Sequence, residues 1–366
     1  MENWEIAYVM PSLYFEKTFD TPLIAMVPYS DERVVAICKT NPSAKKLLNC
    51  FIDNYNKKVE PAVLIIHSSA PKSIWENEAI ISFRNIVSIS IMLRGWAEVR
   101  PGSFPISPLF SNTFDFYPII LGKNGGFFYS TPAVNDYHPK NASLIGMPNN
   151  YVPIKYFVTM YDKAICDALI TIWYQRFIKP GRNSFNSRQI FRSIEVAYHA
   201  LSVPIKNQTT IFDLGVTFIL WVSAFEILLH PKKGDVGPKK VITDLGTVHW
   251  GNKELNAKRY VVKIMKKRVN LCQKLYNEIY MNRNDFIHGN KISSRKLHAF
   301  GNKNLQHLWV FAPIIYRTAL ILYLDKYFPN LIKKLVLSDK SILRYMNNAP
   351  YENCLMQLMN KKRIRA

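Results

Sequence analysis

Long apolar segments separated by helix-breaking residues run through the chain from residue 154 onward, and they restrict what it can fold into. The breakers include Pro204, Gly289 and Gly301. Between them the segments have helical length and predict helices at 154–178, 187–201, 211–229, 257–287 and 305–327. Because an amphipathic helix must bury its apolar stripe against another element, we expect an all-α bundle over residues 154–330.

The first 130 residues mix two kinds of signal. Short β-branched or apolar runs bounded by turn residues predict strands at 23–27, 34–38 and 62–67. Residues 78–95 have helical length and end at Gly95, and 114–121 with 126–130 flank a Gly-rich turn that predicts a hairpin. The expected fold class is therefore α+β, with a mixed α/β domain over 1–130 preceding the bundle.

Two further segments complete the predicted organisation. Residues 131–153 are rich in Pro, Asn, Gly and Ser and lack periodicity, which indicates a linker or a long surface loop. Residues 331–366 form a basic C-terminal tail that we expect to be helical and then frayed. Such a tail is either solvated or in contact with nucleic acid, and we favour contact.

A membrane protein and a disulfide-stabilised protein are both disfavoured. The apolar segment 211–229 contains Asp213 and Glu226, and a charge at mid-bilayer costs roughly 2.5–3.5 kcal/mol. The acidic start of the chain is unlike a signal peptide, and the five cysteines form no Cys-x2-Cys pair. We expect a cytoplasmic protein with no membrane contact, no structural metal and no cofactor.

The positive charge is concentrated in the second part of the chain. The whole chain carries +22; residues 231–366 hold 27 Lys and Arg against 8 Asp and Glu. A local surplus of that size attracts polyanions, so nucleic acid is the favoured partner, although an anionic membrane surface would use the same charge.

Arg283 occupies the centre of an apolar stripe on the segment 257–287. On a wheel of ~100° per residue, the apolar and aromatic residues within about 70° of it are Cys272, Leu275, Tyr276, Ile279, Tyr280, Phe286 and Ile287. A guanidinium stays charged in proteins, so burial there requires an anionic partner.

Asn284 and His288 lie one turn apart on the adjacent face, and Gly289 follows at the position where helices commonly stop. Cleavage of RNA without a metal needs a group that moves the 2′-hydroxyl proton and a fixed cation for the phosphorane charge. His288 suits the first role because imidazole changes charge near neutral pH, and Arg283 suits the second. Asn284 is suited to hold the scissile phosphate or to fix the imidazole tautomer.

The structural alternative is that Arg283 belongs to a buried ion pair and that His288 caps the helix. Glu226 is the natural partner because it shares a face with apolar residues of the segment 211–229. The residue pattern alone leaves both interpretations open.

The segment Tyr280–Gly289, which holds Arg283-Asn284-Asp285-Phe286-Ile287-His288, resembles the Arg-x4–6-His motif of HEPN domains. The preceding Glu-bearing segment 221–229 resembles the corresponding helix of the Apea-like HEPN branch, and the apolar segment 308–327 fits the closing helix. The resemblance covers about residues 154–330.

This resemblance implies a helical bundle that dimerises so that two motifs face each other and act as a metal-independent endoribonuclease. Arg283, Asn284 and His288 are the catalytic positions carried over, with Glu226 and Asp285 as structural or supporting residues. Many members are abortive-infection, antiphage or toxin effectors, restrained by a regulatory protein or released by a phage trigger. The N-terminal domain would be a sensor or regulator.

Other residues carry weaker predictions. The basic residues Lys263, Lys266, Lys267 and Arg268 precede the motif and are candidates to guide RNA toward it. His298 and His307 flank the motif, with a surface or core role favoured, and the chain has no His-x3-His or His-Glu-x-x-His metal pattern. Two other functions remain open: an inert HEPN scaffold that holds RNA or nucleotide, and a basic DNA-binding protein.

Overall fold

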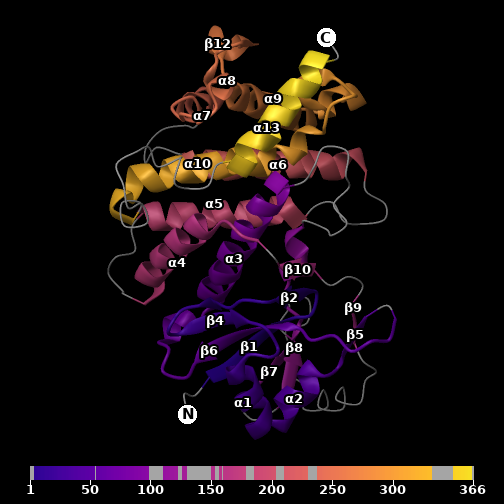
Figure 1. Ribbon diagram of the computed structural model, residues 1–366, viewed down its shortest axis with the longest axis vertical. Helices are drawn as coiled ribbons and strands as arrows, with labels where there is room; N and C mark the ends of the chain where they lie inside the picture. Colours follow the sequence, from indigo (N-terminus) through magenta and orange to yellow (C-terminus); the bar gives the residue numbers. More distant parts are fainter. Residues whose placement is uncertain are drawn as a thin grey trace. The chain divides into compact units, whose positions relative to one another are not determined.

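The computed structural model describes residues 4–53, 55–98, 110–122, 126–129, 150–152, 156–158, 160–178, 185–202, 210–229, 237–331 and 349–364. The protein is a mixed α+β chain in which a small N-terminal antiparallel sheet is followed by a helical region (Figure 1). It divides into two compact units. Unit 1 is Met1–Arg84 with Asn112–Thr159, and unit 2 is Asn85–Ser111 with Met160–Ala366.

Unit 1 is built on a four-stranded sheet in the order β1-β6-β4-β3. Its strands are all antiparallel to their neighbours: β1 (Trp4–Met10), β6 (Ala62–His67), β4 (Ile24–Val27) and β3 (Phe19–Asp20). Both central strands, β4 and β6, are buried over nearly their whole length. Their short continuous apolar runs are what predicted them from the sequence, and both predictions are confirmed.

Three shorter strand pairs complete the β structure of unit 1. They are β2 (Leu13–Phe15) with β10 (Tyr156–Val158), β5 (Phe51–Asp53) with β9 (Asn150–Val152), and β7 (Ile119–Leu121) with β8 (Phe127–Tyr129). The pair β7–β8 confirms the predicted hairpin, although Phe114 belongs to a 3-10 turn, η2 (Ser111–Phe114). The other two pairs are parallel and join residues more than 90 positions apart.

The predicted strand at 34–38 is wrong, because this segment lies in helix α1 (Glu32–Thr40), which is followed by α2 (Pro42–Leu48). Asp31 caps α1 by accepting a hydrogen bond from the backbone N–H of Arg33, and Asn41 caps α2 in the same way. These caps outweigh the β preference of Val34 and Val35.

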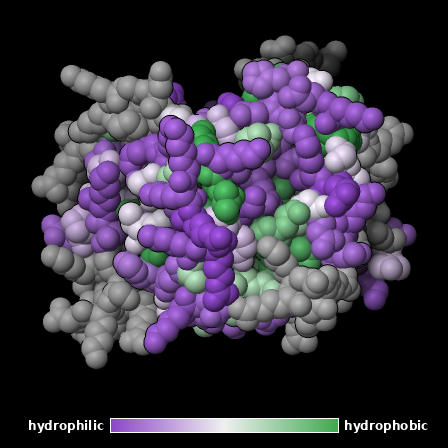
Figure 2. Space-filling view, turned by 90° about the horizontal axis from the view of Figure 1, so that it is seen from above, coloured by the Kyte–Doolittle hydropathy of each residue, from purple (hydrophilic) through white to green (hydrophobic). Residues whose placement is uncertain are grey.

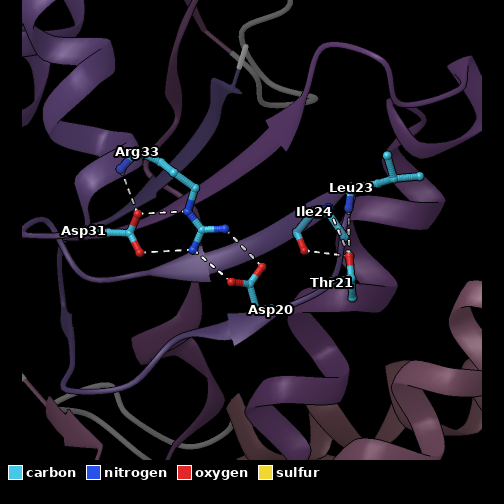
Figure 3. A network of polar contacts seen from close by, with 6 residues as sticks. All are labelled: Asp20, Thr21, Leu23, Ile24, Asp31 and Arg33. Carbon is cyan, nitrogen blue, oxygen red and sulfur yellow. Dashed lines mark hydrogen bonds and ion pairs between the residues drawn. The ribbon is translucent and has the colours of Figure 1, made fainter. Parts of the chain in front are cut away.

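The start of α1 is tied to the sheet by a network around Arg33 (Figure 3). The guanidinium donates to both carboxylate oxygens of Asp31, at 2.9 and 3.0 Å, and to Asp20 of β3 at 3.1 Å. Burial opposes ionisation of Asp31, but the hydrogen bonds from Arg33 outweigh it and lower the pKa of this carboxyl. The network is structural, since its charges satisfy one another.

Unit 2 is mainly helical. Besides the second part of α3 (Asn77–Glu98), its helices are α4 (Lys163–Phe177), α5 (Phe185–Ser202), α6 (Ile211–Leu229), α7 (Pro238–Leu245), α8 (Lys253–Asn256), α9 (Leu271–Ile287), α10 (Ala312–Tyr327) and α13 (Ala349–Ile364). Helix α6 packs against α5, α7, α9 and α10, so it is the central helix of the unit. A buried polar contact, Ser193 Oγ to Tyr316 Oη at 2.7 Å, joins α5 to α10.

The sequence predicted α6 with its observed ends and α5 to within two residues, and it predicted most of α3. Gly95 does not end α3, which continues to Glu98. Helix α10 begins at Ala312 after a 3-10 turn, η7 (Leu308–Val310), rather than at residue 305.

Two predicted helices are wrong in their first part. The segment 154–178 contains the strand β10, and its helix α4 begins only after the cap Asp162. The segment 257–287 begins with a hairpin, β11 (Tyr260–Val262) and β12 (Lys267–Val269). Helix α9 follows it, with Asn270 and Gln273 forming a capping box.

The sequence predicted that residues 331–366 form a basic tail, helical and then frayed, that is either solvated or in contact with nucleic acid. In the described part of this segment, helix α13 packs against the protein instead. Helix α13 buries Tyr351, Cys354, Leu355 and Leu358 within unit 2. Tyr351 donates a hydrogen bond of 2.8 Å to Asp162, which also accepts from Arg317 of α10 at 2.6 Å. Apolar positions spaced three and four apart along 351–358 are the signal for this packing.

The two units differ from the predicted domains in that each is made of two chain segments. The chain passes between them inside α3, between Arg84 and Asn85, again between Ser111 and Asn112, and finally between Thr159 and Met160, shortly after the predicted linker 131–153. A reading along the chain assumes continuous domains, whereas unit 1 recovers residues 112–159 through strand pairing. Of the predicted linker, 150–152 is the strand β9, and the other residues lie outside the described ranges.

Two described helical segments are long and apolar enough to cross a membrane, Ile211–Leu229 and Leu308–Tyr327. In the most apolar stretch of each, 44% and 78% of residues respectively are buried inside the protein. Both segments contribute to the core of unit 2.

Candidate active site

The motif lies in the last turn of α9, and the helix ends immediately after it. Gly289 adopts a left-handed conformation with φ +65°, as the sequence predicted. Its N–H donates to Phe286 O, and the N–H of Asn290 donates to Asp285 O at 2.9 Å. These two bonds form a Schellman motif, which fixes the direction of the chain beyond His288.

His288 is the residue that ends α9, and its side chain is exposed. Its backbone N–H donates to Asn284 O at 3.0 Å. Within the part of the chain that the structure describes, the imidazole has no hydrogen bond or ion pair. The cap is therefore made by the backbone, and the imidazole is available to a ligand.

Arg283 is half-buried rather than buried, which corrects the prediction from the helical wheel. The same wheel placed Ile287 in the stripe, yet its exposed fraction is 48%. Both departures follow the burial along α9: its buried residues lie between Leu271 and Asn282, and the residues after Asn282 are half-buried or exposed.

The guanidinium of Arg283 is largely unsatisfied by the protein. Its Nη1 donates to the side-chain oxygen of Asn284 at 3.0 Å, and its Nε is buried without a hydrogen-bond partner. Arginine has five N–H donors, so most of its donor capacity remains for an anion.

Glu226 of α6 is near Arg283 but forms no direct ion pair with it. Burial raises the pKa of this carboxyl, and the positive charge of Arg283 lowers it only in part. The expected buried ion pair is therefore replaced by a longer-range attraction.

Two tyrosines, predicted from the sequence only as members of the apolar and aromatic stripe, complete this polar cluster. Burial, together with Glu226, raises the pKa of Tyr276 well above its ordinary value, and its hydroxyl has no hydrogen-bond partner. The Arg283 guanidinium lies 5.8 Å from the ring centre of Tyr280. These tyrosines lie seven and three residues before Arg283, a spacing that places them on the same face of α9 as Arg283. This spacing could have predicted that they lie near it.

A glycine on α6 allows the motif to approach the central helix. A Cβ built on Gly215 would lie 2.2 Å from the ring of Phe286, the residue three positions after Arg283. No side chain other than hydrogen fits at this crossing unless Phe286 moves. Gly215 was not among the residues predicted to matter for the site, although an isolated Gly inside a helical segment commonly marks close packing.

Exposed apolar side chains lie on both helices that meet at Gly215 and Phe286. On α6, Phe212 and Val216 are 74% and 46% exposed, and on α9, Met281 and Ile287 are 51% and 48% exposed. Exposure of large apolar side chains beside a polar motif is typical of a surface that contacts a partner.

Asp285 is part of the motif on α9, but its carboxylate binds residues beyond the end of the helix rather than the polar cluster. It accepts from Lys296 at 2.6 Å and from the side chain of Asn290 at 3.2 Å. A structural role is therefore supported for this residue.

The predicted RNA-guiding residues do not lie beside the motif along α9. Lys267 and Arg268 are on β12, and Lys263 and Lys266 are on the turn that precedes it. The hairpin joins α9 at its N-terminal end, whereas the motif is at its C-terminal end.

His298 and His307 form a pair of their own. Their rings lie 3.9 Å apart at a tilt of 33°, and their residues form an isolated antiparallel bridge. Burial and the neighbouring His298 lower the pKa of His307. Among the described residues, no three His, Cys, Asp or Glu side chains are placed to hold a metal ion.

Unit 1 contains an open cleft of about 710 Å³ beside β1. Its lining includes Trp4, Tyr8 and Trp75, and Glu5 is the sole charged residue among the described residues that line it. This arrangement suggests no particular chemistry.

The comparisons with known proteins identify no relative: no family model, no curated protein and no solved structure matches this chain.

Proposed function

We propose that this protein is a metal-independent endoribonuclease that uses Arg283, Asn284 and His288. The observation that supports the proposal most is the incomplete hydrogen bonding of Arg283, because a purely structural arginine in this environment would pair directly with Glu226. The resemblance to HEPN domains adds the reaction type and the role of an antiphage or toxin effector.

Arg283 is the cation for the reacting phosphate. Its half-buried position strengthens electrostatic attraction relative to bulk water, and its hydrogen bond with Asn284 restrains the guanidinium before substrate binds. Asn284 keeps its amide N–H donors for a phosphate oxygen.

His288 moves the proton. The 2′-oxygen attacks the adjacent phosphorus, the imidazole accepts the 2′-hydroxyl proton, and the bond to the 5′-oxygen breaks as that oxygen takes up a proton. The products are a 2′,3′-cyclic phosphate and a 5′-hydroxyl. The exposed imidazole has the access that this role requires.

Cleavage requires polar groups on opposite sides of the reacting phosphate, and a single copy of the motif supplies such a pair poorly. Arg283 and His288 are about 140° apart around α9 at ~100° per residue. A second copy of the chain, docked through exposed residues such as Phe212, Val216 and Ile287, would supply the missing side. We expect a dimer by light scattering; a fully active monomer would contradict this arrangement.

The test is incubation of the pure protein with tRNA and mRNA in EDTA, followed by end-group analysis. We expect cleavage to persist in EDTA and to leave 2′,3′-cyclic phosphate or 3′-phosphate ends. A matched control is His249→Ala, which alters an exposed histidine away from the motif. Products with 3′-hydroxyl ends, or activity only with added magnesium, would remove the motif from the mechanism. Binding without cleavage would favour an inert scaffold.

A further inference from the structure

The hairpin β11–β12 presents different residues on its two faces. Tyr260 pairs with Val269, Val261 with Arg268 and Val262 with Lys267. Val262 and Val269 are 1% exposed, whereas Val261 is 63% exposed and Arg268 is also exposed. Because residues opposite each other share a face, Val261 and Arg268 mark the outward face of the hairpin.

The hairpin is anchored to unit 2 at its base. The ring of Tyr260 stacks on Phe300 at 5.4 Å and 17°. The backbone N–H of Phe300 donates to Glu278 of α9 at 2.9 Å. The strands are therefore held against α9, and the turn Lys263–Lys266 projects beyond them.

The hairpin carries many positive charges and no negative one. Residues 258–268 contain six basic residues and no Asp or Glu: Lys258, Arg259, Lys263, Lys266, Lys267 and Arg268. Arg259 pairs with Glu254 at 2.7 Å. Lys263, Lys266 and Lys267 are exposed and have no ion-pair partner in the described part of the chain.

The surroundings of the hairpin are also polar. Figure 2 looks onto the end of unit 2 that carries the hairpin and α13, and most of the visible surface is hydrophilic, with small hydrophobic areas between. Unpaired like charges repel one another, and a bound polyanion would offset that repulsion.

We infer that this hairpin is an RNA-binding arm, a second contact site separate from the motif. The inference rests on the proposed function, because it takes RNA as the substrate. Basic residues lie on strand β12 as well as on the turn, so the phosphate groups of an RNA strand lying along the hairpin would meet positive charge over its whole length. A hairpin that inserts into a membrane would instead carry apolar residues at its tip without these basic residues beside them.

The length of α9 sets the length of the RNA. From Asn270, which caps the start of α9, to His288 the helix rises about 27 Å at ~1.5 Å per residue. At ~3.4 Å per nucleotide along a helical strand, about eight nucleotides span that distance. Stacked RNA strands shorter than this reach only one of the two sites.

The test compares Lys263→Gln/Lys266→Gln/Lys267→Gln with a control of equal charge, Lys239→Gln/Lys253→Gln/Lys303→Gln, whose lysines are exposed elsewhere in unit 2. Both sets are made in His288→Ala protein, so that RNA is not consumed. Binding of single-stranded RNAs from about 4 to 24 nucleotides is measured by fluorescence anisotropy at several salt concentrations.

We expect affinity to rise steeply near eight nucleotides, and this step to disappear in the arm variant but not in the control. The arm variant should bind the longest RNA roughly tenfold or more weakly, with a salt slope lower by about 2 at ~0.7 per phosphate contact. Equal loss in both triple variants, no loss in the arm variant, or loss of binding to phosphatidylserine vesicles with RNA binding intact would overturn the inference. Because binding is measured without cleavage, failure of the ribonuclease proposal is detected separately, by the EDTA assay.

Discussion

At the scale of single residues, the motif combines two environments within one helical turn. Arg283 is half-buried beside Glu226 and Tyr276, whereas His288 is exposed where α9 ends. A half-buried cation attracts an anion more strongly than one in bulk water does, and an exposed imidazole is accessible for proton transfer. The difference in environment also makes the two residues separable by experiment.

Replacing His288 should separate catalysis from stability. His288→Ala is expected to lower the cleavage rate by about 10²–10⁴, while the free energy of unfolding changes by under about 1 kcal/mol because the side chain is exposed. Arg283→Ala should abolish cleavage as well and cost roughly 1–3 kcal/mol of stability, since Glu226 loses its nearest cation. Cleavage assays measure the loss of rate, and thermal melts measure the change in stability of each variant. A His288→Ala protein that melts far below wild type, or that cleaves normally, would make His288 a structural residue.

Glu226 predicts a pH dependence of stability. Burial raises the pKa of this carboxyl in the folded protein. A raised folded pKa contributes stability at acid pH that is lost as pH rises through it. Glu226→Gln should therefore remove the loss of stability that wild type shows from about pH 4.3, the ordinary value for Glu, toward neutrality. Melting temperatures measured from pH 4 to 8 test this. The control is Glu195→Gln, because Glu195 is an exposed residue of α5. Parallel profiles for wild type and Glu226→Gln would contradict it.

At the scale of helices, the contact between α6 and α9 positions the motif. Gly215 on α6 lets the ring of Phe286 approach so closely that a Cβ would overlap it. This one crossing brings α6, with Glu226, alongside the helix that bears Arg283. Any added volume at residue 215 must displace Phe286 and the end of α9 with it.

Gly215→Val should therefore destabilise unit 2 by roughly 1–3 kcal/mol, as overpacked sites do, and should reduce cleavage by moving the motif. The control is Gly237→Ala, because a Cβ at Gly237 meets nothing within 4 Å. The readouts are thermal melting and cleavage rate. Wild-type values for Gly215→Val would mean that the α6–α9 contact does not position the site.

At the scale of the whole chain, distant segments close unit 2. Asp162 lies before α4, Arg317 on α10 and Tyr351 on α13, and the three meet in a buried network. The guanidinium also lies 3.8 Å from the ring centre of Tyr351. The last helix is therefore held in the core by a charge–hydrogen-bond contact, in addition to its apolar residues.

Asp162→Asn should cost about 3–5 kcal/mol, because it removes the negative charge that accepts hydrogen bonds from the buried side chains of Arg317 and Tyr351. Asp167→Asn is the matched control, since Asp167 forms an exposed pair with Lys163 on the same helix and should change stability by under about 1 kcal/mol. Chemical unfolding followed by fluorescence gives both values. Equal effects of the two substitutions would show that the Asp162 network does not stabilise unit 2.

The sequence by itself determined the elements whose signals are local. Residues 211–229, 187–201 and 62–67 carry continuous or periodic apolar patterns, and each forms the expected element. Gly289 likewise predicted the end of α9, because a left-handed residue strongly favours glycine. The spacing placed Arg283, Asn284 and His288 together at the end of this helix, and their catalytic role stays a prediction.

Only the tertiary structure decided what depends on residues far apart in the chain. The pairing of β10 with β2 and of β9 with β5, the burial of α13, and the close crossing at Gly215 each depend on a partner segment that no local window contains. The separation of Arg283 from Glu226 is of this kind as well. A helical wheel places both residues toward the core, but the distance between two side chains on different helices is set by how those helices pack.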